Sequence, residues 1–262
     1  IHIAADTGMC RIGYVPSPEA IEEVKKIAAL PGITMQGIFT HFSEADIADK
    51  EWAHEQHRRF SDFIDALKAA GVTFNIHHCC NSAGTLELPD FHREMIRPGI
   101  IQYGYDASKE VLVTGTKIKP VMSLRCCITH LKTIYEGDCV GYGRHFTAKG
   151  PTKIATLPIG YADGYNRALS SKIDVIVHGV RAHQVGNICM DQCMIDVSHI
   201  PDVKVGDEVV LFGEQGSECV SADEIADTCH TIIHEITCNI NRRVPRVYVQ
   251  NGKIVQRLEY LT

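Results

Sequence analysis

The pattern of apolar residues changes part-way along this chain, at about residue 113, and this change constrains the fold more than any other feature. Before it, short apolar runs alternate with helical patterns, as repeated βα units do. After it, strand-like runs follow one another between Gly and Asp turns, with one helical stretch near residues 221–234. The sequence therefore predicts an α/β domain over residues 1–112 and a mostly β domain over residues 113–262.

The first domain is expected to contain about four βα units, whereas a closed barrel of this kind contains eight. The expected elements are helices over residues 18–30 and 50–70 and strands over residues 37–40, 72–78 and 95–96. Polar side chains stand at or just after the ends of these strands, among them His41, Asn81 and Arg97. Because a β/α barrel places its site at the carboxyl ends of its strands, we expect these side chains to lie at one site.

The second domain is expected to be built from short strands. These are predicted over residues 121–133, 153–157, 174–177, 193–197 and 208–212. The helical stretch begins at Ser221, which with Glu224 has the spacing of a capping box. Two turns, GYGR and GYADGY, hold Tyr142 and Tyr161 beside Gly residues. Such a tyrosine can act as a general base if nearby cations lower its pKa, although ordinary hairpin turns carry the same residues.

Composition argues against several classes of protein. The net charge of −6, with Lys and Arg scattered along the chain, argues against nucleic acid as a partner. No run of 18 apolar residues occurs and the start of the chain lacks the pattern of a signal peptide, so we expect a cytoplasmic protein without membrane contact. The odd number of cysteines, eleven, predicts no disulfide framework, and the run from His77 to Cys80 alternates between strand faces, so no metal site is expected there.

Six further motifs accompany the two tyrosine turns. They are DTGMCRIG (6–13), GIFTHF (37–42), IHHCCNSAG (76–84), REMIRPGIIQYG (93–104), NICMDQCMIDV (187–197) and NRRVPRVYV (241–249). In this order and spacing they resemble the alanine racemases, almost from end to end. The resemblance implies a fold-type III enzyme with pyridoxal 5'-phosphate as cofactor, made of the C-terminal half of a (β/α)8 barrel followed by a mostly β domain.

The resemblance also implies an activity. Racemases of this family interconvert L- and D-alanine with one base on each face of the substrate, and so supply D-alanine for peptidoglycan. They act on a small amino-acid substrate as homodimers with shared active sites. The related serine racemases of glycopeptide-resistance systems share these motifs, so a serine racemase stays an alternative.

The residues of the cofactor site follow from the matching motifs. Arg97 would be the partner of the pyridine nitrogen, and a guanidinium cannot hand its proton to that ring. Ser82, Gly99 and Ile100 would bind the phosphate. The full set of cofactor-binding residues that the resemblance implies is His41, His78, Asn81, Ser82, Arg97, Gly99 and Ile100.

The residues of the substrate site come from both domains. Tyr142 matches the catalytic tyrosine and Tyr161 lines the pocket entrance. Arg11 reaches the substrate carboxylate, and Met190 and Asp191 complete the carboxylate site, Met190 through its backbone N–H. In such enzymes Arg11 works with its own barrel, while the other four residues are lent by the partner subunit.

Three departures from the family pattern are visible. No lysine of this chain stands in a motif that matches the Schiff-base lysine, which in the family lies upstream of DTGM. We therefore expect a fragment that lacks the N-terminal part and is inactive alone; a non-catalytic fragment that binds the cofactor is a further alternative. Ala4 stands where some members carry a carbamylated lysine, and His234 where a tyrosine is usual.

Overall fold

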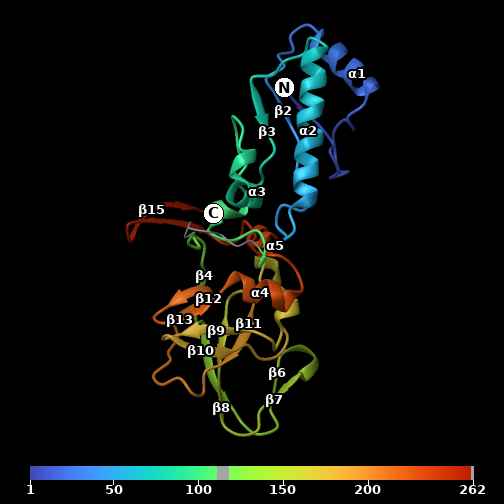
Figure 1. The fold of residues 1–262 in the computed structure, drawn as a ribbon. Helices are drawn as coiled ribbons and strands as arrows, with labels where there is room; N and C mark the ends of the chain where they lie inside the picture. The colour runs from blue at the N-terminus through green and yellow to red at the C-terminus, as the bar shows by residue number, and fades with distance from the viewer. Residues whose placement is uncertain (111–117, 261–262) are drawn as a thin grey trace. The chain divides into compact units, whose positions relative to one another are not determined.

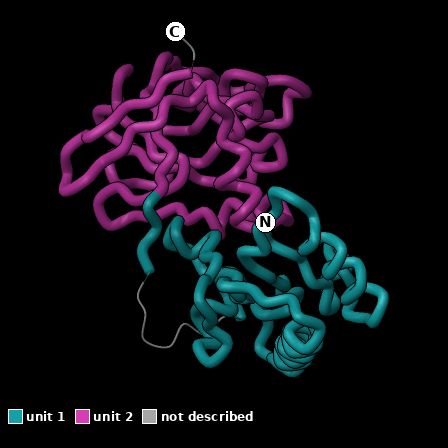
Figure 2. The backbone as a smooth tube through the Cα atoms, turned by 90° about the horizontal axis from the view of Figure 1, so that it is seen from above, with its two compact units in different colours: residues 1–121 teal, residues 122–262 magenta. Residues whose placement is uncertain are grey.

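The computed structural model describes residues 1–110 and 118–260 of the chain. These residues form two compact units, Ile1–Val121 and Met122–Thr262, which are coloured separately in Figure 2. The domain boundary that we predicted after residue 112 lies outside the described residues. No helix among the described residues is long and apolar enough to cross a membrane.

Unit 1 contains a three-stranded parallel sheet with helices between its strands (Figure 1). The strands β1 (His2–Ala4), β2 (Gly37–Phe39) and β3 (Ile76–His78) lie in that order, and α1 (Pro18–Ala28) and α2 (Glu51–Ala69) connect them. Ser17 caps α1, because its hydroxyl accepts the N–H of Ala20 at 3.1 Å. The predicted α/β character of this part of the chain is confirmed.

The core of unit 1 forms where α1 and α2 cover the sheet. On α2 the buried positions Ala53, Phe60, Phe63 and Leu67 fall at helical spacing. They pack in one cluster with residues of β1, α1 and β2, namely Ile3, Val24 and Ile38. Fully buried side chains of this size supply most of the stability of a small unit.

After β3, three short helices complete unit 1. They are α3 (Ser82–Glu87), η1 (Pro89–Phe91) and η2 (Ile100–Tyr103). The strand predicted over residues 95–96 is wrong, since this segment is irregular. Ile96 is 37% exposed, so the segment does not bury an apolar face against the sheet. Pro98 has no N–H to donate, so it cannot continue the hydrogen bonds between strands. One bond, from Arg97 N to Cys80 O at 2.9 Å, holds it beside the end of β3.

Unit 2 is mostly antiparallel β structure. Its larger sheet joins β10 (Val180–His183), β9 (Asp174–Val177), β12 (Glu208–Gln215), β13 (Glu218–Val220) and β4 (Leu124–Cys127), with β4 paired to β12. A second sheet joins β11 (Cys193–Asp196), β8 (Thr152–Leu157) and β5 (His130–Ile134). Two small ribbons pair β6 (Cys139–Val140) with β7 (Phe146–Thr147) and β14 (Arg246–Gln250) with β15 (Lys253–Leu258).

Two elements of unit 2 differ from the sequence prediction. The single strand predicted over residues 121–133 is two strands, β4 and β5, which belong to different sheets because the chain turns at the buried Ile128. The predicted helix over residues 221–234 is two helices, α4 (Ala222–Cys229) and α5 (Ile233–Asn239). His230 breaks it with a φ of 55°, a left-handed conformation that ends a helix.

The predicted capping box at α4 is formed by half. The Ser221 hydroxyl accepts the N–H of Glu224 at 3.0 Å. The Glu224 carboxylate does not return to the backbone of Ser221, because it accepts two hydrogen bonds from the Arg181 guanidinium at 2.8 and 2.9 Å. A bidentate ion pair therefore replaces the second half of the motif.

Candidate functional site

Arg97 is the centre of the polar cluster at the carboxyl ends of the unit 1 strands. Its Nη1 donates to His78 Nδ1 at 2.5 Å, and its Nη2 donates to Thr40 O at 2.8 Å. The same Nη2 lies 3.3 Å from His41 Nδ1 and 3.3 Å from Cys79 O. The structure therefore brings Arg97, His41 and His78 together, although Arg97 comes from the irregular segment after β3 and not from the end of a predicted strand.

Both histidines are held neutral by this arrangement. Burial, followed by the charges of Arg97 and Arg11, lowers the pKa of His41 to about 4. Burial, followed by the charge of Arg97 and the neighbouring His2 and His77, lowers the pKa of His78 to about 4. Each ring therefore accepts a hydrogen bond from the guanidinium through Nδ1 instead of repelling it.

The donors left on Arg97 fit a ring nitrogen of an unprotonated pyridine. Among the described residues no carboxylate pairs with this guanidinium, and its Nε–H has no acceptor. A guanidinium stays protonated in proteins, so the free N–H can donate a hydrogen bond but cannot transfer its proton. Such a donor suits a ligand atom that carries a lone pair.

Two short helices begin side by side next to Arg97. The Asn81 side chain caps α3 by accepting the N–H of Gly84 at 3.0 Å, and the buried Ser82 hydroxyl accepts the N–H of Gly99 at 2.8 Å. The first N–H groups of α3 and η2, those of Ser82 and Ile100, have no partner within their own helices. Gly99 stands between them without a Cβ. N–H groups and a hydroxyl in this arrangement fit a phosphate group.

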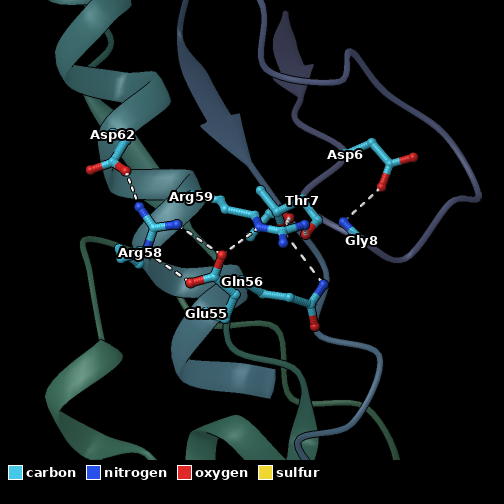
Figure 3. A network of polar contacts seen from close by, with 9 residues as sticks. Asp6, Thr7, Gly8, Glu55, Gln56, Arg58, Arg59 and Asp62 are labelled. Carbon is cyan, nitrogen blue, oxygen red and sulfur yellow. Dashed lines mark hydrogen bonds and ion pairs between the residues drawn. The ribbon is translucent and has the colours of Figure 1, made fainter. Parts of the chain in front are cut away.

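The loop that carries Arg11 contacts α2 through the network in Figure 3, in which Arg59 Nη1 donates to Thr7 O at 3.4 Å. Asp6 Oδ1 accepts the N–H of Gly8 at 3.0 Å and that of Cys10 at 2.9 Å. Thr7 Oγ1 lies 2.7 Å from Thr40 Oγ1, which ties the loop to the strand end. Arg11 itself is exposed.

Gln56 connects this loop to the His41 segment, and the sequence analysis missed it. Its amide nitrogen lies 3.4 Å from Thr7 Oγ1 and donates to His41 O at 3.1 Å, while its Oε1 accepts the N–H of Ser43 at 2.9 Å. Gln56 is fully buried on the apolar face of α2. A glutamine between Ala53 and Phe60 on that face was the signal that could have identified it.

The position of Ala4 shows what holds the Arg11 loop when no lysine is present there. Tyr14 N donates to Ala4 O at 2.9 Å, and Asp6 N donates to Tyr14 O at 2.8 Å, so the loop closes back onto β1. A Cβ on Gly13 would lie 2.7 Å from Ala4 O, and only glycine allows this approach. These backbone contacts, together with the side-chain contacts of Asp6 and Thr7, position the loop.

In unit 2 the predicted residues Tyr161, Met190 and Asp191 lie on two turns that contact each other. Tyr161 N donates to Cys189 O at 3.1 Å, and Ala162 N donates to Met190 O at 3.0 Å. A Cβ on Gly160 would lie 2.2 Å from Cys189 O, so this glycine permits the contact. Among the described residues the N–H of Met190 has no acceptor, which fits the role predicted for it.

Tyr142 joins this group of turns. Its carbonyl oxygen accepts a hydrogen bond from Asn187 Nδ2 at 2.8 Å, and Asn187 belongs to the same NICMDQ segment as Met190. The side chains of Tyr142, Tyr161 and Met190 are 75%, 43% and 54% exposed. We call the turns that carry Tyr142, Tyr161, Met190 and Asp191 the tyrosine turns.

Asp191 is paired with an arginine of another motif, whereas His234 is exposed. Asp191 Oδ1 accepts a hydrogen bond from Arg243 at 2.6 Å, and Arg243 also lies 3.4 Å from Asp163. Arg243 belongs to the NRRVPRVYV motif, so the two motifs meet through an ion pair. His234 is exposed on α5.

Known proteins resemble this chain over its whole length. Residues 1–107 match the family model "Alanine racemase, N-terminal domain" and residues 121–248 match "Alanine racemase, C-terminal domain". Alanine racemase 1 of Clostridium acetobutylicum is 47% identical over 261 residues, which cover 100% of this chain and 68% of that protein. The alanine racemase of Clostridium tetani is 47% identical over 262 residues, with the same two coverages.

Solved structures agree with this result. The alanine racemase of Clostridium difficile 630 shares 41% identity at a TM-score of 0.95, over 100% of this chain and 67% of that one. An alanine racemase from Bacillus anthracis with bound L-Ala-P shares 36% identity at a TM-score of 0.94, over 99% of this chain and 67% of that one. This chain therefore spans about two thirds of the length of its relatives.

Proposed function

The chain belongs to the alanine racemase family, and we propose from this that it interconverts L- and D-alanine with bound pyridoxal 5'-phosphate. The observation that carries the proposal is the Arg97 cluster, where a guanidinium without a carboxylate partner among the described residues keeps an N–H free. The relatives from C. acetobutylicum and C. tetani are alanine racemases, and nothing in the comparisons favours serine.

We propose the following residues for the cofactor. Arg97 donates to the ring nitrogen, Ser82, Gly99 and Ile100 bind the phosphate, and Asn81 holds the helix start that carries Ser82. His41 and His78 keep Arg97 in place through their Nδ1 atoms. When bound, pyridoxal phosphate withdraws electrons from an attached amino acid and makes its α-proton acidic. Because Arg97 keeps its proton, it would leave the ring nitrogen neutral. This would limit the withdrawal of electrons and disfavour side reactions.

We propose that Tyr142 moves a proton at one face of the substrate Cα. Its phenol is exposed and its backbone is fixed by Asn187. Arg11 and the N–H of Met190 bind the substrate carboxylate, Asp191 holds the Met190 turn through Arg243, and Tyr161 lines the entrance. The base on the opposite face is the lysine that holds the cofactor.

Racemisation of alanine by the full-length polypeptide that the gene encodes tests the proposal. We expect conversion of each enantiomer of alanine, measured by optical rotation, and lower kcat/KM for serine. A serine preference would move the assignment to the serine racemases. Bound cofactor without turnover of either amino acid would support the non-catalytic alternative instead.

We further propose that the active form is a homodimer in which the tyrosine turns of one subunit serve the Arg97 cluster of the other. Three exposed side chains, two of them aromatic, support it, because side chains of this kind are enriched at interfaces. In the full-length polypeptide, an Arg97→Ala variant and a Tyr142→Phe variant should each be inactive alone. After mixing and random pairing, about one quarter of all sites would carry both intact residues.

The control is each variant mixed with itself, which should stay inactive. Failure of the mixed variants to regain activity, although exchange of subunits is verified by mass spectrometry, would favour a site built within one subunit.

We also propose that no lysine of this chain holds the cofactor covalently, since none stands in a motif that matches the family lysine. Lys50, for example, is engaged by the Glu87 carboxylate at 2.5 Å. Borohydride reduction of this polypeptide with pyridoxal phosphate should give no specific adduct in mass spectrometry, and the polypeptide alone should not racemise alanine. A single stoichiometric adduct together with activity would overturn this proposal.

A further inference from the structure

Three residues of unit 1 form a continuous hydrogen-bonded chain that begins at the first strand. His2 Nδ1 lies 2.8 Å from His78 Nε2, and His78 Nδ1 lies 2.5 Å from Arg97 Nη1. His2 is at the start of β1 and Arg97 is 95 positions further along. His2 was not identified as a site residue from the sequence.

The direction of every hydrogen bond in this chain follows from the chemistry of Arg97. A guanidinium has donors only and keeps its proton, so His78 Nδ1 must be an unprotonated acceptor. His78 is neutral, hence its proton is on Nε2. That N–H donates to His2, so His2 Nδ1 must also be an unprotonated acceptor. Both rings are therefore restricted to the tautomer with the proton on Nε2.

The sheet is built so that the His2 ring can reach His78. In the register of β1 with β2, His2 stands opposite Gly37, while His78 stands opposite Phe39 in the register of β2 with β3. A Cβ on Gly37 would lie 2.6 Å from Nδ1 and Cε1 of the His2 ring. Gly37 thus provides the space through which the His2 ring crosses the central strand.

The His78 ring also makes a stacking contact. The Phe39 ring stacks on the His78 ring, with centroids 5.0 Å apart and an interplanar angle of 12°. Arg97 itself lies over the Phe39 ring at 5.4 Å. The stack fixes the plane of the His78 ring, but it does not select which nitrogen faces Arg97. The two hydrogen bonds do so together, since a ring turned over would place Cδ2 towards Arg97 and Cε1 towards His2.

We propose that His2 is a positioning residue for Arg97: by accepting the Nε2–H of His78 it holds His78 in the orientation that fixes the guanidinium. For its effect on catalysis this inference rests on the proposed function, because it assumes that Arg97 faces the cofactor ring. The tautomers themselves do not depend on any activity.

The variants to compare are His2→Phe and His2→Asn. Phenylalanine keeps the size of the ring and removes the acceptor, whereas the Oδ1 of asparagine lies close to the place of Nδ1 and can accept the same hydrogen bond. His77→Phe is the matched control, because His77 is adjacent to His78 on β3 but pairs with Glu94 at 2.9 Å and not with Arg97. The His78→Gln variant assigns the His78 signal among the 14 histidines.

Nitrogen-15 NMR of the histidine rings is the first test. In the wild type and in His77→Phe we expect His78 to show a protonated Nε2 that exchanges slowly with water and an unprotonated Nδ1. The slowly exchanging signal should be lost in His2→Phe and kept in His2→Asn. A proton on Nδ1 of His78, or a signal that does not change in His2→Phe, would overturn the inference.

Kinetics of the full-length polypeptide is the second test. His2→Phe should lower kcat by up to about 10²-fold, as expected for a misplaced group near the reaction, with a smaller change in KM. His2→Asn should restore most of the loss. Unchanged kcat in His2→Phe would refute the positioning role even if the tautomers are as stated. Absence of racemisation in the wild type would instead refute the proposed function, and the NMR result would still decide the tautomers.

Discussion

The two units hold their candidate site residues in opposite ways. In unit 1, Arg97, His41 and His78 are wholly or partly buried and are joined to one another by side-chain hydrogen bonds. In unit 2, Tyr142 and Tyr161 are exposed, and it is their backbones that are fixed. The side chains of unit 1 are therefore organised in advance by their neighbours, whereas the phenols of unit 2 have conformational freedom left.

Because of this difference, a mutation can change the stability of the fold and the activity by different amounts in the two units. A buried polar group that loses its partner destabilises the fold by about 1–3 kcal/mol. An exposed side chain away from such a partner changes stability by less than about 0.5 kcal/mol. Substitutions in unit 1 should thus change stability and activity together, whereas substitutions of the exposed tyrosine side chains in unit 2 should change activity alone.

Tyr142→Phe gives the largest expected effect. Loss of a general base lowers the rate by about 10² to 10⁴, or about 3–5 kcal/mol in activation free energy, and kcat/KM must fall equally in both directions because the two enantiomers have the same free energy. The melting temperature should stay the same, because the phenol is exposed. Kinetics in both directions and thermal unfolding are the measurements, with Tyr135→Phe, also exposed in unit 2, as the control. Equal rates in Tyr142→Phe and wild type would move the role to Tyr161.

Acid should destabilise unit 1 through its histidines. The folded-state pKa of His41 and of His78 is about 4, below the ordinary value of 6.5, so the unfolded state binds more protons between these two values. The stability they contribute is complete above pH 6.5 and falls as the pH decreases towards the folded-state pKa. Urea denaturation at pH 5, 6 and 7 measures the slope. A His78→Asn variant should have a smaller slope, and an equal one would contradict the assignment.

Gly160→Ala should break the tyrosine turns through their backbone. The added Cβ would lie 2.2 Å from Cys189 O and 2.4 Å from Met190 O, so the turn must open. We expect a loss of about 1–3 kcal/mol in stability, as for overpacking in general, together with reduced activity. Gly150→Ala is the control, because nothing lies within 4 Å of its added Cβ. Similar unfolding midpoints for the two variants would show that the turn does not depend on this contact.

The smallest expected effect compares the helix caps of the two units. The Ser17 and Ser221 hydroxyls accept capping hydrogen bonds of 3.1 and 3.0 Å. Ser17→Ala and Ser221→Ala should each cost about 1 kcal/mol in denaturant unfolding. Equal losses of unfolding free energy would show that the two units differ only in how they hold their site residues. A clearly larger loss in one unit would show that its helices too are held differently.

The sequence predicted what depends on local signals. Ser17 and Pro18 located the start of α1, and residues 174–177 were predicted as the strand that β9 forms. The errors arose where the outcome depends on distant partners. Nothing local in residues 121–133 shows that β4 and β5 pair with different strands, and Met95 with Ile96 is apolar without being buried in a sheet.

The candidate site divides in the same way. Its motif residues followed from the resemblance, and the structure brings His41, His78 and Arg97 into contact. The roles of the predicted site residues stay predictions. His2 and Gln56 were not predicted, because each acts through a contact with a residue that the sequence does not connect to it. A histidine at the first strand has no pattern of its own until the register of β1, β2 and β3 is known.

The missing acidic partner of Arg97 also has a consequence for how fast a ligand arrives. With two neutral histidines around it and no carboxylate paired to it in the described residues, the guanidinium leaves its positive charge uncompensated, and Arg11 adds a second charge that reaches His41. An anion approaching from solution therefore meets an attractive potential over a distance of about 10 Å at 0.1 M salt. Capture of a phosphate-bearing ligand should become slower as the ionic strength rises, while a neutral analogue should arrive at a rate that salt leaves unchanged.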